Sequence, residues 1–586
     1  STQFPMNGIT ATDAEAAMAL AVATGESVED VSQREPSVEI FAEPNGTWQR
    51  RQWLAPVWVQ TGGDGDGADD WQPLDIELVA NAEGDLSPRA YPSRLVFAGS
   101  ALVGEPLVDW AMPGSEVSLS VLAPANVSAP VVEGARARYV NVYPGVDLVF
   151  DVRPTGFEQY YVVHDRDSLA AINNALHIDY AVENGTLASS ATALEVLDAQ
   201  GVTVAAIPAA EGWDAAQDPY LPTPVLAPWA VEGENPAATV SDRIAETVPL
   251  PWHVQSNAEA TRVSIPIPLA WSDSATTRFP LVIDPIPLSP YFGWDGHVRS
   301  DNPNTSYYTG TELFIGQDPT YGPVYMSLLN INTSGIIGKD IISANAYVWN
   351  NWSATCTQVA WYAYSTAAPY TYSTWNNLPT IHQGPYSSTH TRGHTSGSSP
   401  YCSQDWAWID VTPFAQAWSG QPGTTNQGIL LKAADDTTAQ WKRFLSADSS
   451  SANKPHLSIW YNQPPYTPTG LSYTAPVLTA RGKVSATVTD PDGTYYQLRA
   501  LFTIERRVIG SQDPWQVVLD QAEGSLVAHG AVSTREVDLT AGFEYRVKAW
   551  AQDTRIKSTA ASGYITFAIP STSHFQDVPA TDDDDV

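Results

Sequence analysis

Short runs of alternating apolar and polar residues dominate the pattern along the chain. Between residues 38 and 288, Asn, Asp, Gly and Pro repeatedly interrupt these runs, as in VEIFAEPNGTWQRRQWLAPVWVQ. A period of two residues is typical of strands with one buried face, and the interruptions are typical of turns. Two runs meet at residues 153–156 within ARYVNVYPGVDLVFDVRPTGFEQYYVV, which predicts a hairpin there.

One helix is predicted near the N-terminus, over residues 13–24. This stretch, DAEAAMALAVAT, is rich in Ala, and Gly25 follows it as a C-cap. Its apolar side chains are small, so we expect the helix to pack weakly or to stay mobile. The chain as a whole is therefore predicted to be all-β, with tandem β-sandwich domains and a short N-terminal helical segment.

Residues 466–570 show the alternating pattern again, after a linker that starts at Pro464 and Pro465. The runs are KVSATVTDPDGTYYQLRALFTIE, FEYRVKAWAQD and GYITFAI. Within the first run, residues 490–493 (DPDG) predict a tight turn between two strands. We expect an Ig-like or fibronectin-like sandwich here, followed by an acidic tail or linker from Ser571.

Length and charge narrow the function classes. A chain of 586 residues is too long for one core and suggests three or four domains. The formal net charge is −35, from 64 acidic and 29 basic residues, and such a chain repels nucleic acid. It contains no run of about 18 apolar residues, so we expect no membrane span.

Residues 293–462 carry the most distinctive motifs. The segment opens with GWDGHVRSDNPNTSYYTGTELFIG and continues through WIDVTPFAQAWSG, GILLKA, WKRFLSAD and KPHLSIWYN. In this order it resembles the DNRLRE-type modules of secreted bacterial proteins, which are classed with the carbohydrate-binding modules. The resemblance implies glycan binding rather than catalysis, and a location outside the cell or at the cell wall.

The preceding region has a resemblance of its own. It contains ALAVATGESVEDV, EPNGTW, WQPLDIELV, YPGVDLVFDVRPTGFEQYYVV and RFPLVIDP in one order. That order resembles the N-terminal region of secreted actinobacterial Rhs/YD-repeat proteins, relatives of WapA proteins, in which a DNRLRE module follows directly. The chain departs from that family because it contains neither YD repeats nor a C-terminal toxin.

These observations predict five segments. They are an N-terminal extension with a short helix (1–37), a β-rich Rhs/WapA-like domain (38–288), a DNRLRE-type carbohydrate-binding-like sandwich (289–463), an Ig/fibronectin-like sandwich (464–570) and an acidic tail or linker (571–586).

Cys356 and Cys402 are the two cysteines of the chain, and both lie in the central segment. In a secreted protein, a lone pair within one domain is most simply a disulfide. Closing this loop would stabilise the domain by roughly 3–4 kcal/mol. A second interpretation adds His390 and His394 to form a Cys₂His₂ zinc site, although the Gly/Ser/Thr-rich context and the spacing favour surface histidines and a disulfide.

Aromatic side chains are the candidate glycan ligands, because sugar C–H faces stack on flat rings. Alternation places Tyr347 and Trp349 on one strand face and Ala346 and Val348 on the other, so one of these faces must be core. The candidate rings are Trp349, Trp352, Tyr362, Tyr364, Tyr372 and Trp406. For each ring, the alternative is burial in a sandwich core.

No cofactor is implied with certainty, but a structural calcium ion is a candidate. Asp295, Asp301 and Asp410 could supply hard oxygen ligands. The loop Asp64-Gly-Asp66-Gly-Ala-Asp69-Asp70 also concentrates carboxylates, but it lacks the spacing and the terminal Glu of an EF-hand. A solvated acidic turn is the alternative reading of that loop.

No catalytic motif is recognisable, since GxSxG, HExxH, Walker and GxGxxG patterns are absent. The ordered motifs of residues 293–462 and their aromatic density instead predict a secreted, non-enzymatic protein that binds extracellular or cell-wall polysaccharide. A second hypothesis is the front portion of an Rhs-type polymorphic toxin or surface-assembly protein, with other segments of a longer chain as partners. A third is a polysaccharide-degrading enzyme, which requires a cleft with clustered carboxylates of raised pKa.

Overall fold

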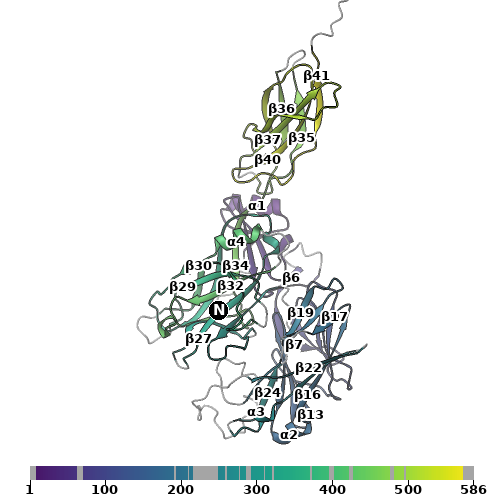
Figure 1. Cartoon of the computed structure of the whole chain (residues 1–586), viewed down its shortest axis with the longest axis vertical. Coiled ribbons are helices and arrows are strands. Elements are labelled where there is room, and N and C mark those ends of the chain that lie inside the picture. Colours follow the sequence, from purple (N-terminus) through teal and green to yellow (C-terminus); the bar gives the residue numbers. More distant parts are fainter. Residues whose placement is uncertain are drawn as a thin grey trace, which may run out of the picture.

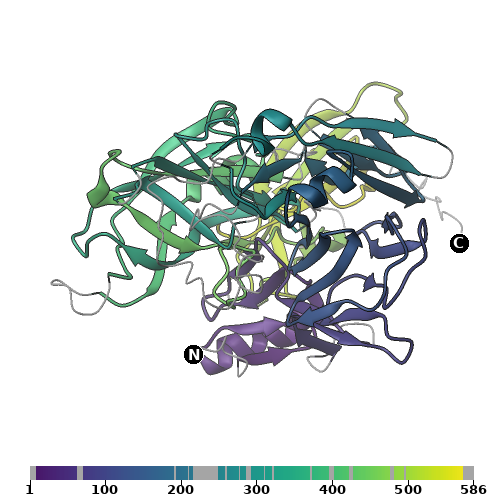
Figure 2. The same ribbon diagram turned by 90° about the horizontal axis from the view of Figure 1, so that it is seen from below.

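The computed structural model describes residues 8–571 except 63–66, 68–69, 190–192, 209, 215–247, 258–259, 276, 285–291, 309, 320–321, 370–372, 395–401, 421–425, 476–480 and 494–495. Three β-sandwich units are visible in Figure 1, and the narrow C-terminal unit extends from a wider body. Figure 2 shows the other two units side by side. The predicted all-β class is confirmed.

The first sandwich pairs an eight-stranded sheet with a seven-stranded sheet and a small three-stranded one. The predicted hairpin is confirmed, because Arg153 pairs with Gly156 where β14 turns into β15. The core between the sheets contains Phe97, Phe150 and Phe157, whose rings lie 5.6–6.1 Å apart.

The elements of the first sandwich are β7 (Asp75–Ala80), β8 (Leu86–Ala90), β9 (Leu95–Phe97), β10 (Pro106–Ala111), β11 (Ser118–Leu122), β12 (Val131–Glu133), β13 (Arg136–Tyr143), β14 (Val146–Arg153), β15 (Gly156–Val163), α2 (Arg166–Ala171), β16 (Ala175–Glu183), β17 (Thr186–Ser189), β18 (Ala193–Leu197), β19 (Thr203–Pro208), β20 (Glu211–Trp213), β21 (Val248–Pro249), β22 (His253–Ser256), β23 (Thr261–Pro266), α3 (Leu269–Ser272) and β24 (Leu281–Asp284).

The central module combines residues 292–463 with residues 8–60 from the start of the chain. One sheet runs β1-β2-β3-β4-β34-β28, and β4 pairs with β34 from Trp48↔Tyr461 to Trp53↔His456. The facing sheet contains β25, β27, β32, β29 and β30, and β26 pairs with both β27 and β33. The division expected at residues 37/38 therefore cuts through one continuous sheet.

The elements of the central module are β1 (Ile9–Ala11), α1 (Ala14–Thr24), β2 (Val28–Asp30), η1 (Val31–Gln33), β3 (Val38–Ala42), β4 (Trp48–Trp53), β25 (Trp294–Arg299), β26 (Glu312–Gln317), β27 (Val324–Asn332), η4 (Ser334–Ile336), β28 (Asp340–Ser353), β29 (Trp361–Thr366), β30 (Ile381–Ser388), β31 (Asp405–Asp410), α4 (Thr412–Ser419), β32 (Asn426–Ala433), η5 (Thr438–Gln440), β33 (Lys442–Leu445) and β34 (His456–Asn462). A two-stranded ribbon, β5 (Trp58–Gln60) with β6 (Trp71–Pro73), leads to the first sandwich.

The N-terminal helix α1 has the predicted limits. The Asp13 side chain accepts a hydrogen bond from the Ala16 backbone N–H at 2.8 Å, and Gly25 ends the helix with a φ of 74°. The expectation of weak packing is wrong, because Ala17, Met18 and Ala21 are 0–3% exposed in the core of the central module. Small side chains let the helix lie close to its sheet.

The C-terminal sandwich packs three strands on four, in the orders β35-β36-β39 and β38-β37-β40-β41. The Tyr545 hydroxyl donates a hydrogen bond to the Thr540 carbonyl at 2.8 Å, as tyrosine corners do in other sandwiches. The strands are β35 (Thr469–Thr474), β36 (Arg481–Thr487), β37 (Arg499–Val508), β38 (Gln516–Glu523), β39 (Val532–Asp538), β40 (Phe543–Gln552) and β41 (Ile565–Ile569).

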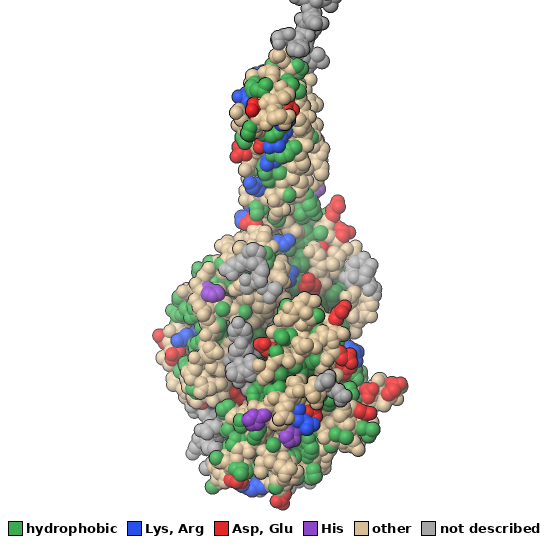
Figure 3. Space-filling view, turned by 45° about the vertical axis from the view of Figure 1, so that its right-hand side comes forward, with side chains coloured by type: hydrophobic (Ala, Val, Ile, Leu, Met, Phe, Trp, Pro, Cys, Tyr) green, Lys and Arg blue, Asp and Glu red, His purple; other side chains and the backbone are tan. Residues whose placement is uncertain are grey.

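Acidic side chains recur over the face seen in Figure 3, on the body and on the C-terminal unit alike. This distribution fits the net charge of −35. No helix in the described part of the chain has the length and apolar character of a membrane span.

Candidate glycan-binding site

The strands β28 and β31 place aromatic rings on the outer face of the central module. Ala346 and Val348 point into the core and are 3% and 1% exposed, so Tyr347 and Trp349 lie on the opposite face. The antiparallel register sets Tyr347 opposite Trp408 and Trp349 opposite Trp406. Residues that face each other across two strands project from the same side of the sheet.

We call Tyr347, Trp349, Trp406 and Trp408 the aromatic face. Trp408 is 38% exposed, and the other three rings are half-buried. The Trp406 ring stands at 88° to Trp349, with centroids 5.4 Å apart, and at 86° to Tyr347, with centroids 6.3 Å apart. The rings are therefore not coplanar, and the face is bent.

Two buried rings support the aromatic face from β34 and β4. The His456 ring stacks on Tyr347 at 4.9 Å and 8°, and Trp53 packs against His456 at 4.4 Å. Burial, together with the nearby Arg51 guanidinium, lowers the pKa of His456 well below its ordinary value. The imidazole is thus neutral at neutral pH and acts as a flat, uncharged support for Tyr347.

Polar groups surround the rings, as hydroxyl recognition requires. The exposed carboxylate of Asp405 lies 3.8 Å from Arg392 Nε, next to Trp406. The His390 ring lies 4.6 Å from Trp408, and the Ser388 hydroxyl donates to the Trp408 carbonyl at 2.8 Å. The site thus combines flat aromatic rings with charged and neutral hydrogen-bonding groups.

Of the six predicted ring ligands, the structure brings Trp349 and Trp406 together. Trp352 packs against the buried cluster of Phe314, Tyr325 and Trp441 instead. Tyr364 packs on the opposite sheet against a cluster that includes Leu328, and its β29 neighbour Tyr362 is half-buried. Tyr372 lies outside the described residues.

The sequence reasoning missed Tyr347 and Trp408 as partners of the two tryptophans. Alternation in WAWID shows that Trp406 and Trp408 share a face, and this signal was available from the sequence. The pairing of β28 with β31 was not, because about 60 residues separate the paired positions.

The three proposed calcium ligands occupy separate places. Asp295 is fully buried and accepts a hydrogen bond from the Ala447 backbone N–H at 2.8 Å. Asp301 forms a two-pronged ion pair with Arg299, and exposed Asp410 caps the backbone N–H of Thr412. They do not meet in one cluster. Of the acidic loop, Asp64, Asp66 and Asp69 lie outside the described residues.

The cysteines form the predicted disulfide, with Cα atoms 5.9 Å apart. This bond contradicts the alternative Cys₂His₂ zinc site, because a disulfide has no thiolate to offer a metal. His390 instead lies by Trp408, and His394 Nδ1 contacts the Ser353 carbonyl at 2.9 Å.

A groove of about 670 Å³ separates the first sandwich from the central module. Its polar lining includes Glu195 and Asp198 from the first sandwich and Asn332 and Asn426 from the central module. Its volume lies in the range of small-ligand sites. This groove is the second place at which a glycan could sit.

Buried polar and charged groups lie where the same two units meet. Arg153 binds Glu158 at 2.8 Å, and the Thr155 hydroxyl donates across the interface to Asp448 at 3.1 Å. Burial raises the pKa of Glu158 to about 7 and that of Asp448 above its usual value, while Arg153 opposes both changes. Glu158 and Asp448 are 0% and 1% exposed, so these carboxyls lie in the interface and not on the wall of an open cleft.

The fold and the ring arrangement thus define a β-sandwich with a polar–aromatic outer face. Residues 293–461 match the model of carbohydrate-binding module family 96, which covers less than a third of the chain. The match identifies this segment as a carbohydrate-binding module. All four rings of the aromatic face lie within it.

No curated protein matches the chain. Solved structures with partial similarity to it include glycosidases. They include a Parabacteroides merdae beta-glucuronidase (9% identity, 42% of this chain, 28% of that chain, TM-score 0.11), a Ruminococcus gnavus beta-glucuronidase (6%, 49%, 39%, 0.12) and a Parabacteroides distasonis beta-1,2-glucanase (11%, 47%, 37%, 0.12). The chain spans less than two fifths of each, and such TM-scores carry no argument about activity.

Proposed function

We propose that this protein binds polysaccharide outside the cell, without cleaving it, through the aromatic face of its central module. The observation that carries the proposal is the outward set of four rings inside the segment that matches a carbohydrate-binding family. The disulfide, which persists in oxidising compartments, supports the extracellular location.

The bent shape of the face favours one class of ligand. A flat crystalline surface needs coplanar rings, whereas Trp406 stands almost perpendicular to Trp349 and Tyr347. A single soluble chain can turn one sugar onto Trp408 and place the next against the edge of Trp406. Asp405 and Arg392 then lie where hydroxyl groups need partners.

Affinity electrophoresis of the full chain against a panel of soluble polysaccharides tests the proposal, with insoluble cellulose and chitin as the crystalline arm. We expect retention by at least one soluble glycan. Trp408→Ala and Trp406→Ala should each weaken that binding by about 5-fold, because each removes one stacking ring worth roughly 1 kcal/mol.

Trp550→Ala is the matched control, since it removes a half-buried Trp from the C-terminal sandwich. It should bind as the wild type does. Asp198→Asn probes the rival groove between the two units. If only Asp198→Asn weakens binding, the glycan lies in the groove, and the assignment to the aromatic face is wrong. Release of reducing ends during incubation would contradict the non-catalytic role.

A further inference from the structure

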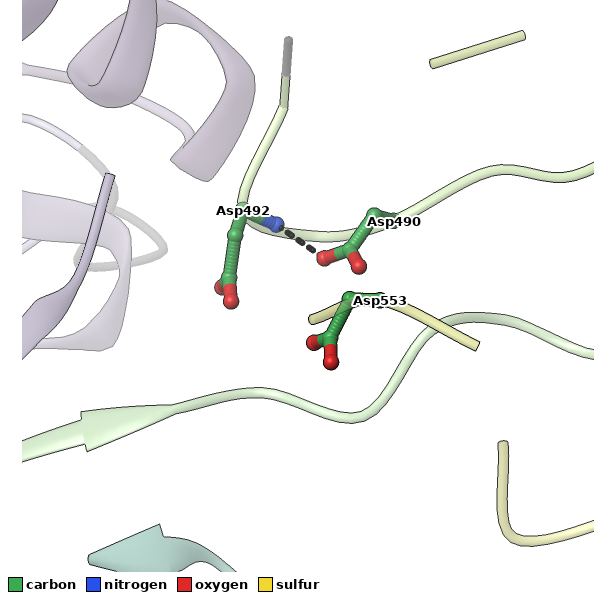
Figure 4. A group of neighbouring side chains, drawn as sticks. All are labelled: Asp490, Asp492 and Asp553. Atoms are coloured by element: carbon green, nitrogen blue, oxygen red, sulfur yellow. Dashed lines mark hydrogen bonds between the residues drawn. The ribbon is translucent and has the colours of Figure 1, made fainter. Parts of the chain in front are cut away.

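Three aspartates meet where the C-terminal sandwich joins the central module. Asp490 and Asp492 belong to the DPDG turn between β36 and β37, which Gly493 closes with a φ of 71°, and Asp553 directly follows β40. They are 1%, 0% and 4% exposed, and each offers a carboxylate oxygen within 4.8 Å of the others. Figure 4 shows the three side chains gathered in one place.

The central module contributes to the same locus. The Trp48 indole N–H donates to Asp492 at 2.8 Å, and the Gln463 backbone N–H donates to its other oxygen at 3.0 Å. The Asn462 side-chain amide donates to Asp553 at 2.7 Å. The three aspartates thus belong to the C-terminal sandwich, and the central module supplies hydrogen-bond donors to two of them.

Two buried oxygens at this locus have no hydrogen-bond partner. They are Asp490 Oδ2 and Asn462 Oδ1, on residues that are 1% and 0% exposed. None of the three carboxylates has an ion-pair partner among the described residues. Uncompensated buried carboxylates are costly unless a cation joins them.

We propose that Asp490, Asp492, Asp553 and the Asn462 side-chain oxygen bind one calcium ion. All the ligand atoms are oxygens, which favours a hard cation over zinc, whose usual ligands are Cys sulfur and His nitrogen. Calcium accepts a mixed set of carboxylate and amide oxygens in irregular geometry, whereas magnesium keeps most of its water and fits a closed, buried site poorly. The unpartnered Asp490 and Asn462 oxygens are the two that the ion would satisfy directly.

None of the proposed ligands belongs to the aromatic face, so the proposal does not rest on glycan binding. Because its ligands come from both units, the ion would hold the C-terminal sandwich in a fixed orientation on the central module. The Arg555–Asp340 ion pair at 2.5 Å already joins the two units beside it. Loss of the ion would loosen that junction without unfolding either core.

Terbium luminescence on the full chain provides a direct test, because Tb³⁺ substitutes for Ca²⁺ and Trp48 can transfer excitation to it. We expect saturable emission on tryptophan excitation at physiological salt, reversed by calcium and not by equal magnesium. The Tm of the full chain in millimolar calcium should also be about 3 °C or more above its Tm in EDTA.

Asp490→Asn and Asp553→Asn should abolish both the emission and the calcium-dependent Tm shift. Asp538→Asn is the matched control, since its side chain is 74% exposed in the same sandwich. In EDTA, Asp490→Asn should be at least as stable as the wild type, because it removes a buried charge, and this separates lost binding from misfolding. Equal terbium emission from Asp490→Asn and the wild type, or no calcium-dependent shift in the wild type, would overturn the proposal.

Discussion

Burial sets the chemistry of individual side chains at the interfaces of this protein. Glu158 is fully buried, its Oε1 has no partner, and Arg153 lies 2.8 Å from its other oxygen. Desolvation outweighs this pairing and raises the pKa of Glu158 from 4.5 to about 7. The folded protein therefore retains a proton that the unfolded chain releases.

A raised folded-state pKa in an acid makes stability fall with increasing pH. Between about pH 4.5 and pH 7 the folded state binds more protons than the unfolded state, so the free energy of unfolding decreases across that window. For Glu158 this change amounts to at most about 3 kcal/mol. We expect Glu158→Gln to flatten the decrease, as measured by urea unfolding at pH 5 and pH 8.

Glu116→Gln, at an exposed position of the same sandwich, is the control and should leave the pH dependence unchanged. A Glu158→Gln variant with the same pH dependence as the wild type would mean that Arg153 keeps the carboxylate ionised throughout.

At this scale, the sequence predicts which side of a strand a residue occupies, but not what covers it. The alternation of Ala346 to Trp349 correctly separated core from outer face. It could not show that Tyr347 rests on His456, because that support comes from a strand more than 100 residues away. Ring exposure depends on such neighbours.

Among the elements, the disulfide ties together the two strands that carry the aromatic face. Cys356 follows the end of β28, and Cys402 precedes the start of β31. The bond closes a loop with a sequence separation of 46 and so restricts the unfolded chain. It also holds the registered ends of the strands that present Trp349 and Trp406.

The double variant Cys356→Ser/Cys402→Ser should lose about 3–4 kcal/mol of unfolding free energy in urea titrations. Adding dithiothreitol should lower the wild type to the same value and leave the variant unaffected. If dithiothreitol does not change the stability of the wild type, either the bond does not form in solution or it constrains little.

Local elements were the easiest to predict. Helix α1 has its N-cap at Asp13 and its C-cap at Gly25, and the hairpin turns where RPTG predicts it. These features depend on neighbours in sequence. The DPDG turn was also predicted. Its contact with Asp553 was not, because Asp553 lies about 60 residues further along the chain and no local pattern connects the two.

The whole molecule is built on a pairing between the start of the chain and its middle. Strand β4 covers the edge of β34 along six registered residue pairs, and Trp48 and Leu54 complete the core of the central module. Without this segment, β34 would be an open edge beside an uncovered core. No periodicity in the sequence indicates that strands about 400 residues apart belong together.

Residues 292–463 expressed alone should therefore be poorly soluble or markedly less stable than in the full chain. Co-expression with residues 8–61 should rescue the fragment, giving a complex that co-purifies and unfolds at a higher temperature. Truncation after residue 465 is the control, because it removes a separate sandwich and should leave the central module folded. A soluble fragment 292–463 with the Tm of the central module in the full chain would contradict this expectation.

The antiparallel register of β4 and β34 also determines how the molecule would respond to force. The chain enters β4 at Trp48 and leaves β34 at Asn462, and these residues lie at the same end of the pair. Tension applied at these two residues would break the hydrogen bonds between the strands one residue pair after another, instead of loading all the pairs at once. Trp48 and Asn462 also donate hydrogen bonds to Asp492 and Asp553. These two bonds therefore lie at the end of the strand pair that would separate first, and they would resist its mechanical opening.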